Sequence, residues 1–288
     1  MARALAVKLA RRGDAFALCS ILNAKSGQCS EDCRFCTQSG HYRTDAPVYS
    51  LTDLDTMIAA AAEAQRIGAH HFSIVTSGRG LGGRDLERVI AAVAAIRDRV
   101  GIKVCASLGI LSRSDLERLR AAGLCRYHHN LETSREFFPQ VVSTHTFAER
   151  LDTIVAAREA GLDVCAGGIF GLGESEADRI SMALTLKEYG VDSVPLNILI
   201  PLPGTPLAAT PPLAVSEILR AIALYRLILP EVPIRLAAGR ETALSDFLSS
   251  ALLAGADGMM IGGYLTQRGR LPEADHRLVA EIQRIWRG

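Results

Sequence analysis

The sequence predicts a (β/α)8 barrel of the TIM type, complete or nearly so, with a cysteine-bearing cluster loop after its first strand. Short apolar runs alternate with segments of 3.6-residue periodicity along all 288 residues. Eight such runs in about 250 residues are typical of this barrel. No linker, repeat or charge block interrupts the alternation. We therefore expect one domain over residues 1–288. The alternative is a doubly wound open sheet, since a single sequence does not fix the number of strands.

Strands are expected at eight apolar runs: Phe16–Leu22, His71–Thr76, Ile102–Ser107, Arg126–Asn130, Asp163–Ile169, Ser193–Leu199, Ile234–Ala237 and Gly258–Ile261. Helices are expected between and after them: Thr52–Ile67, Leu86–Arg99, Ser114–Ala122, Thr146–Ala160, Glu176–Tyr189, Ser216–Leu229, Glu241–Ala254 and Ala274–Trp286. An N-terminal helical segment is expected at 1–15, and the C-terminal helix within 271–288. Ser114 and Ser216 are predicted N-caps. Glycines are predicted to end five helices: Gly68, Gly123, Gly161, Gly190 and Gly255.

The composition argues against several classes of partner. The 32 Lys and Arg residues nearly balance 31 Asp and Glu residues, a net charge of +1, so we expect neither nucleic-acid nor membrane binding. No apolar run reaches the length of a membrane span, and Met1–Asp14 lacks the apolar core of a secretory signal. Seven cysteines, an odd number, fit a reduced compartment better than a disulfide framework. We therefore expect a cytoplasmic protein.

Three cysteines after the first strand carry the strongest chemical information. Cys29, Cys33 and Cys36 are spaced C-x3-C-x2-C and supply three thiolates, whereas a [4Fe-4S] cluster normally takes four. The iron without a protein ligand can bind a small molecule, and Phe35 can shield one face of the cluster. A structural zinc site is the alternative, but it needs a second pair of ligands, which does not follow in the sequence.

Other polar residues and cysteines stand on the later strands or at their C-terminal ends: Ser73, Cys105, His128, Asn130, Glu132, Cys165, Asn197 and Arg235. In a barrel these ends form the functional face. Asn130 and Glu132 share one face and suit hydrogen bonds to a ribose or another polar ligand. Cys105 and Cys165 are either core residues or ligands. Arg235, on an otherwise apolar strand, needs an anionic partner if it points into the barrel.

Together these residues resemble the radical S-adenosylmethionine (SAM) superfamily and, within it, the biotin synthases. The cysteine triplet with Phe35 is similar to the superfamily's cluster loop, and residues 167–174 (GGIFGLGE) to its adenine-contacting motif, with Ile169 against the ring. Resemblance to biotin synthases lies in NAKSG (23–27), EDC (31–33), HNLETS (129–134), VPLN (194–197), GTPL (204–207) and RLAAGRE (235–241). It extends from about Cys19 to Arg270.

The resemblance implies a radical enzyme that converts dethiobiotin to biotin by hydrogen abstraction and sulfur insertion. It implies that Arg150 pairs with the SAM carboxylate, that Asn130 and Glu132 lie near the ribose and substrate, and that Asn197 contacts substrate. Cys105, Cys165 and Arg235 would hold an auxiliary iron–sulfur cluster, [2Fe-2S] or another type. A flavodoxin- or ferredoxin-type electron donor and a homodimer are also implied.

The chain departs from the family pattern at three positions on the second and fourth strands. Ser73 stands where the family has a further cluster cysteine; it is a poor ligand at neutral pH, and Cys125 is another candidate. Glu132 replaces an aspartate and His128 an asparagine. The pattern assigns no role to Cys19. The alternative functions are a related radical SAM enzyme that catalyses a rearrangement or other C–H functionalisation without sulfur donation, and a non-catalytic iron–sulfur or zinc scaffold.

Overall fold

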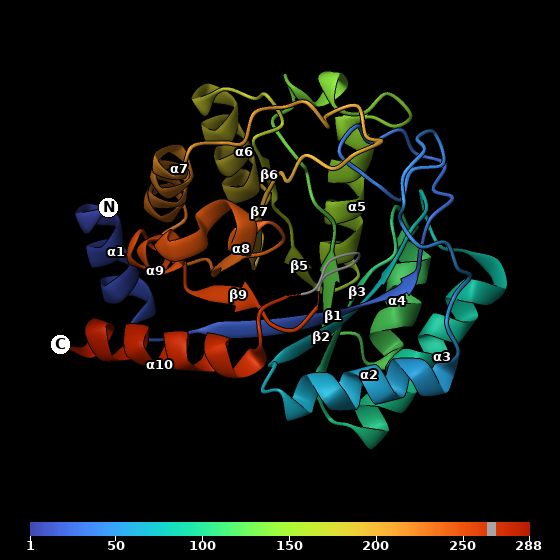
Figure 1. The fold of residues 1–288 in the computed structure, drawn as a ribbon. Coiled ribbons are helices and arrows are strands. Elements are labelled where there is room, and N and C mark those ends of the chain that lie inside the picture. The colour runs from blue at the N-terminus through green and yellow to red at the C-terminus, as the bar shows by residue number, and fades with distance from the viewer. Residues whose placement is uncertain (264–268) are drawn as a thin grey trace.

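The computed structural model describes residues 1–263 and 269–288, and in this part of the chain nine parallel strands form one curved sheet (Figure 1). The spatial order is β5-β4-β3-β2-β1-β9-β8-β7-β6. The strands are β1 (Ala17–Lys25), β2 (His71–Thr76), β3 (Lys103–Ser107), β4 (Arg126–His128), β5 (Asp163–Cys165), β6 (Gly168–Phe170), β7 (Val194–Ile198), β8 (Ile234–Leu236) and β9 (Gly258–Met260).

The two ends of this sheet, β5 and β6, are halves of one strand path, so the sheet closes into a ring. On the β4 side the His129 amide donates to the Cys165 carbonyl, and on the β7 side the Ala166 amide donates to the Ser193 carbonyl, both at 3.0 Å. Counting β5 and β6 as one path, eight paths surround the barrel interior, which confirms the predicted (β/α)8 barrel over the open sheet.

The predicted strand Asp163–Ile169 is wrong in one respect, because it breaks between Cys165 and Gly168. The backbone of Gly167 packs so tightly against β7 that a Cβ there would overlap the carbonyl oxygen of Pro195. A residue with a side chain could not make this approach. The break therefore brings the glycine-rich turn against the neighbouring strand.

Helices cover the outside of the ring (Figure 1). They are α1 (Ala2–Arg12), α2 (Leu54–Arg66), α3 (Gly83–Arg99), α4 (Arg113–Ala122), α5 (Phe147–Glu159), α6 (Glu176–Glu188), α7 (Val215–Ile228), α8 (Arg240–Leu244), α9 (Leu248–Leu253) and α10 (Pro272–Arg287), with short 3-10 turns η1 (Phe138–Gln140) and η2 (Ser245–Phe247). The helices expected at both termini are observed as α1 and α10.

Three local predictions about the helices were wrong. The predicted helix Glu241–Ala254 is divided into α8, η2 and α9 around Ser245, whose φ of 44° is incompatible with a continuous helix. The side chain that caps α4 is Ser112 rather than Ser114, and α7 follows Ala214, not a capping Ser216. By contrast, all five glycines predicted at helix ends have positive φ.

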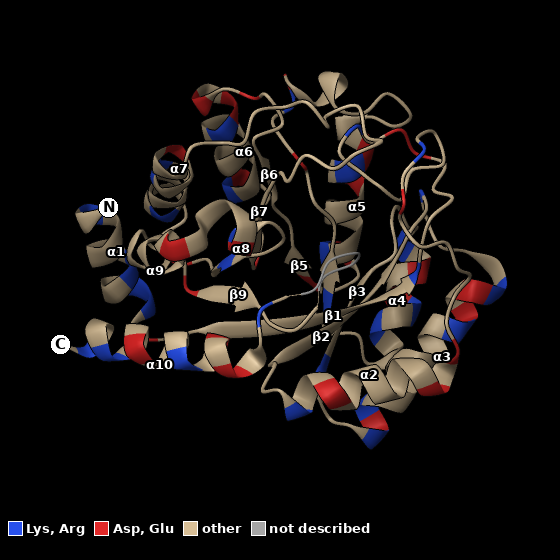
Figure 2. Cartoon of the chain, viewed as in Figure 1, with Lys and Arg blue, Asp and Glu red and all other residues tan. Residues whose placement is uncertain are grey.

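Alternation along each strand separates the two faces of the barrel wall. On β2, Phe72 and Ile74 are buried in the apolar layer beneath the helices, while His71, Ser73 and Val75 alternate with them. Charged residues of both signs are interspersed over the outer helices (Figure 2). Within the described residues, no helix combines the length and apolarity that a membrane crossing would require.

A buried ion pair joins α7 to Asp257, the residue that precedes β9. Arg226 and Asp257 are both 0% exposed, and Arg226 Nη2 lies 3.1 Å from Asp257 Oδ1. Arg226 also donates to the carbonyls of Gly255 at 2.9 Å and Val232 at 2.9 Å. Removing one partner leaves the other charge buried with fewer contacts, which is costly.

We predict that Arg226→Met lowers the free energy of unfolding by about 3–5 kcal/mol in urea titrations. The matched control is Arg220→Met on the same helix, whose side chain is 69% exposed and pairs with Glu176 at the surface. This control should change stability by less than about 1 kcal/mol. Equal losses in the two variants would contradict the assignment of the buried pair as a stabilising contact of the fold.

Candidate active site

A cavity of ≈ 180 Å³ opens at the C-terminal ends of the strands, beside the loop that follows β1. It brings together seven residues predicted from the sequence: Cys29, Cys33, Phe35, Cys36, Asn130, Glu132 and Arg150. They come from the loop after β1, the segment after β4 and the helix α5. The cavity therefore lies where functional groups of this barrel fold are expected.

The cysteine loop is held in shape by its own backbone. The Cys29 amide donates to the Gln38 carbonyl at 3.0 Å, and the Gly40 amide returns to the Cys29 carbonyl at 2.8 Å. Gly27 has a φ of 78°, and a Cβ there would lie 2.6 Å from Val48. Only glycine fits this turn without displacing its neighbour.

The three thiols of this loop suit a shared iron–sulfur cluster. Cys29, Cys33 and Cys36 are free of disulfide bonds and border the same cavity. Burial raises the pKa of Cys36 to about 11 and also raises the pKa of Cys33, and the neighbouring Cys29 adds to both shifts. A metal centre offsets this penalty, because a coordinating thiol is deprotonated by the cation it binds. The donor set therefore fits a cationic metal cluster.

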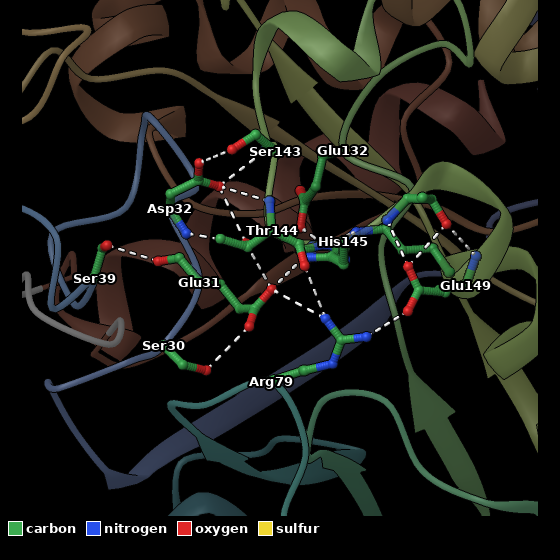
Figure 3. A network of polar contacts seen from close by, with 12 residues as sticks. Ser30, Glu31, Asp32, Ser39, Arg79, Glu132, Ser143, Thr144, His145 and Glu149 are labelled. Atoms are coloured by element: carbon green, nitrogen blue, oxygen red, sulfur yellow. Dashed lines mark hydrogen bonds and ion pairs between the residues drawn. The ribbon is translucent and has the colours of Figure 1, made fainter.

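A network of polar contacts fastens this loop to the start of α5 (Figure 3). Asp32 accepts hydrogen bonds from the backbone amides of Ser143 and Thr144, at 2.9 Å and 3.2 Å. Partial burial raises the pKa of Asp32. These two hydrogen bonds and the one from the Ser143 hydroxyl outweigh that effect and lower the pKa to about 2. Glu31 accepts from Thr144 Oγ1 at 2.7 Å. The two acidic residues thus couple the cysteine loop to a segment more than 100 residues later.

The network continues through His145 to Arg150. His145 Nδ1 lies 2.5 Å from Glu31 Oε2, and Arg150 Nε donates to His145 Nε2 at 3.0 Å. Because Nε2 accepts, the proton of the neutral ring is on Nδ1 and is donated to Glu31. Burial and the Arg150 charge both lower the pKa of His145, which favours this neutral ring. Glu31 and His145 were not predicted as site residues, although Glu31 belongs to the family motif EDC at residues 31–33.

Arg150 also contacts the residues after β4. Its Nη1 donates to the Asn130 carbonyl at 2.9 Å and lies 3.5 Å from Glu132 Oε1. The Asn130 side chain donates to Glu132 Oε2 at 3.2 Å and accepts from the Gly167 amide at 3.1 Å. Arg150, Asn130 and Glu132 thus form one hydrogen-bonded group at the cavity wall.

Glu132 occupies a strained backbone position. Its φ is 68°, in the left-handed region that residues with a side chain seldom adopt. The conformation is held because the Glu132 amide donates to Gly167 O at 3.2 Å and its carbonyl accepts from Ile169 N at 2.8 Å. Such strain is common at functional sites. Here it accompanies a carboxylate that lines the cavity.

Ile169 and Asn197, predicted to contact SAM and substrate, lie outside the lining of this cavity. Ile169 is a buried residue of β6. The Asn197 side chain on β7 donates to the Gly168 carbonyl at 3.1 Å and accepts from the Ala238 amide at 3.1 Å. Asn197 therefore joins the glycine-rich turn to the segment after β8, and its contact with substrate stays a prediction.

A second group of residues, those predicted to hold an auxiliary cluster, lies inside the barrel. Cys105, Cys165 and Arg235 are buried, and Arg235 Nη1 lies 3.0 Å from Cys19 Sγ. Burial lowers the pKa of Arg235, but the ionised forms of the neighbouring cysteines raise it above its usual value overall. Cys19 had no predicted role, because nothing in its local sequence distinguishes it from a core residue.

Several polar atoms in this interior have no protein partner among the described residues. They include Arg235 Nε, two nitrogens of Arg126 and the hydroxyl of Ser73. Buried donors of this kind are costly unless something satisfies them. Two guanidinium groups beside buried thiols suit an anionic, thiolate-bound cluster, so this donor set also fits an iron–sulfur group.

Two family models match this chain, and together they cover the segments that form the site. The family model described as the Radical SAM superfamily matches residues 25–186, and the one described as the Biotin and Thiamin Synthesis associated domain matches residues 195–283. Strands from both segments belong to the same sheet. The two matches together cover both the cysteine loop and Arg235.

Solved structures with the same fold include methylornithine synthase, with a TM-score of 0.79 at 19% identity, covering 97% of this chain and 86% of that one. The FeFe-hydrogenase maturase HydG from Carboxydothermus hydrogenoformans gives a TM-score of 0.82 at 21% identity, covering 97% and 69%. At these identities the likeness concerns the fold alone.

Sequence relatives are much more similar. A protein named biotin synthase from Pelotomaculum thermopropionicum is 51% identical over 280 residues, which cover 97% of this chain and 87% of the relative. Another of that name, from Heliobacterium modesticaldum, is 51% identical over 265 residues, covering 92% and 81%. The chain belongs to the biotin synthase family of the radical SAM superfamily.

Proposed function

We propose that this chain converts dethiobiotin to biotin, using a radical generated from SAM and sulfur from an auxiliary iron–sulfur cluster. The observation that carries the proposal is the cavity that joins the cysteine triplet to Arg150, Asn130 and Glu132. Residues from three distant segments converge there, as binding of a single cofactor requires. Membership of the biotin synthase family supports the choice of substrate.

In this proposal Cys29, Cys33 and Cys36 hold a [4Fe-4S] cluster with one iron open to SAM. When bound, the cluster and SAM supply one-electron cleavage of the S–C5′ bond to methionine and a 5′-deoxyadenosyl radical. Arg150 presents its guanidinium to the SAM carboxylate, a charge-assisted contact. Asn130 and Glu132 provide an amide and a carboxylate for the ribose hydroxyls, and Phe35 and Ile169 provide apolar surface. The barrel wall limits access of water.

Cys105, Cys165 and Arg235 would hold the auxiliary cluster, [2Fe-2S] or another type, and Ser73 occupies the family position of a further ligand. When bound, that cluster supplies the sulfur atom of the product. Arg235 places a positive charge against the thiolates, which its burial at 4% exposure makes effective. Asn197, one strand away, would orient the substrate between the two clusters.

The remaining assignments rest on the family resemblance. We infer a single barrel domain over residues 1–288, with α1 and α10 packed on it. We also infer a flavodoxin- or ferredoxin-type electron donor, a homodimer and a cytoplasmic location. The continuous sheet shared by residues 25–186 and 195–283 supports the single domain.

The function is tested by anaerobic reconstitution with iron and sulfide, followed by incubation with SAM, dethiobiotin and a one-electron reductant. We expect biotin and 5′-deoxyadenosine in the products by mass spectrometry. Cys29→Ala should abolish both products, because it removes a cluster ligand. Formation of 5′-deoxyadenosine without biotin from the unaltered chain would instead favour C–H functionalisation without sulfur donation.

Arg150→Met is predicted to weaken SAM binding roughly 10- to 100-fold, since a hydrogen bond to a charged group contributes about 1.5–3 kcal/mol. The measurement is the SAM dependence of the EPR spectrum of the reduced cluster. Arg135→Met is a suitable control, because Arg135 lies against the ring of Phe147 and outside the cavity lining. An unchanged SAM affinity in Arg150→Met would exclude Arg150 as the carboxylate partner.

His145→Ala is predicted to raise the KM for SAM about three- to tenfold while changing kcat less, because His145 positions Arg150 rather than contacting the reacting atoms. The size of the effect is that of one neutral hydrogen bond, about 1 kcal/mol. Thr153→Ala is the matched control on α5, since Thr153 is also buried and its hydroxyl donates, within the described part of the chain, to the Glu149 carbonyl at 3.0 Å. A fall in kcat at unchanged KM would refute the positioning role.

A further inference from the structure

The strand register places four polar side chains at one level inside the barrel. The residue of β3 in register with Cys19 is Lys103, and Cys105 lies two residues beyond it. Cys165 lies two residues beyond the residue of β5 in register with Cys105. When the register is followed from Cys165 through β7 to β8, Arg235 lies two residues beyond the position in register with Cys165. When it is followed from Arg235 through β9 to β1, Cys19 lies two residues beyond the position in register with Arg235.

Four offsets of two residues make a stagger of eight, the value of a closed eight-stranded barrel. In such barrels, alternate strands each contribute one side chain to a common layer of the interior. Cys19, Cys105, Cys165 and Arg235 therefore form one complete layer. Three thiols and one guanidinium face each other there.

Side-chain contacts agree with this layer. Arg235 Nη1 reaches Cys19 Sγ at 3.0 Å across the intervening strand β9. The path is open because β9 has Gly258 at the crossing point, where a Cβ would lie 2.9 Å from Arg235 Cγ. Cys105 on β3 and Cys165 on β5 are 5% and 7% exposed, as expected for side chains inside the ring.

Ser73 belongs to the next layer. It is on β2, in register with Cys105, and the side chain that follows in its layer is His128 on β4. Its hydroxyl is a neutral donor and acceptor, which must lose a proton of high pKa to bind iron as an anion. Its side-chain oxygen has no partner among the described residues, but it lacks the thiol that Cys19 offers.

Cys125 is a weaker candidate than Cys19. Its Sγ lies 4.0 Å from Cys105 Sγ but donates to the Val104 carbonyl at 3.0 Å. It also directly precedes Arg126, which is on β4 in register with Cys105 and therefore shares its inward face. Neighbouring strand residues face opposite sides, so Cys125 falls outside the layer.

We propose that Cys19, rather than Ser73 or Cys125, supplies the third protein thiolate of the auxiliary iron–sulfur cluster, together with Cys105, Cys165 and Arg235. The proposal rests on the proposed function only in assuming that this cluster exists. Each thiol loses its proton to solvent as its sulfur bonds to iron, and no oxidant is needed. The positive charges of Arg235 and Arg126 offset the thiolate charge within the apolar wall.

The test isolates the interior cluster in the full-length chain carrying Cys29→Ala, Cys33→Ala and Cys36→Ala. In this parent, Cys19→Ala, Ser73→Ala and Cys125→Ala are compared after anaerobic reconstitution with ⁵⁷Fe and sulfide. The readouts are iron and sulfide per chain, the Mössbauer spectrum and thermal unfolding of the apoprotein. We expect the parent, Ser73→Ala and Cys125→Ala to hold the same cluster, and Cys19→Ala to lose its iron and sulfide.

A Cys19→Ala variant that keeps the parent's cluster would overturn the proposal, as would a parent that binds none. If Cys19→Ala unfolds, Cys19→Ser, which keeps the side-chain size, replaces it. We expect Cys19→Ser to lose the iron or change its isomer shift, and an unchanged spectrum would overturn the proposal. Biotin formation by the unaltered chain is assayed separately. Its failure with the Cys19 result intact would reject the proposed function alone.

Discussion

The stagger with which eight parallel strand paths close into a ring determines where the proposed auxiliary cluster can lie. Closure depends on the path made by β5 and β6, which bonds to β4 on one side and to β7 on the other. Once the ring is closed, the register of each strand pair is no longer free, and the interior side chains fall into layers. A thiol on β1 can then meet thiols on β3 and β5, although the strands are far apart in sequence.

The mouth of the barrel depends on a different kind of contact. Glu31 and Asp32 fix the position of the cysteine loop relative to Arg150, because they bond to residues 143–145. These bonds are charge-assisted and partly buried, which makes them stronger than exposed ones. The same contacts orient His145, which accepts from Arg150. The proposed ligands of the cluster and the proposed partner of SAM are therefore positioned by one network.

Local spacing in the sequence was sufficient to predict the parts of the site that are local in space. The triplet Cys29, Cys33 and Cys36 could be read because one loop carries all three, and the helix-ending glycines because each acts within its own turn. The bond from Glu31 to His145 spans 114 residues, so no window of sequence contains it. The break at Gly167 was missed for the same reason, since its cause is the backbone of Pro195 on another strand.

The interior layer shows why residue type and predicted strand position together did not identify the cluster ligand proposed on β1. Ser73 and Cys19 both lie on predicted strands and both alternate toward the interior, so sequence alone does not separate their roles. The two residues differ in the strand path that carries them. The strands β1, β3, β5 and β8 are alternate paths of the ring, whereas β2 lies between β1 and β3. A residue at the level of Cys105, Cys165 and Arg235 must therefore lie on an alternate path, whereas Ser73 on β2 belongs to the neighbouring layer. Cys19 is such a residue, and Gly258 gives Arg235 the room to reach it.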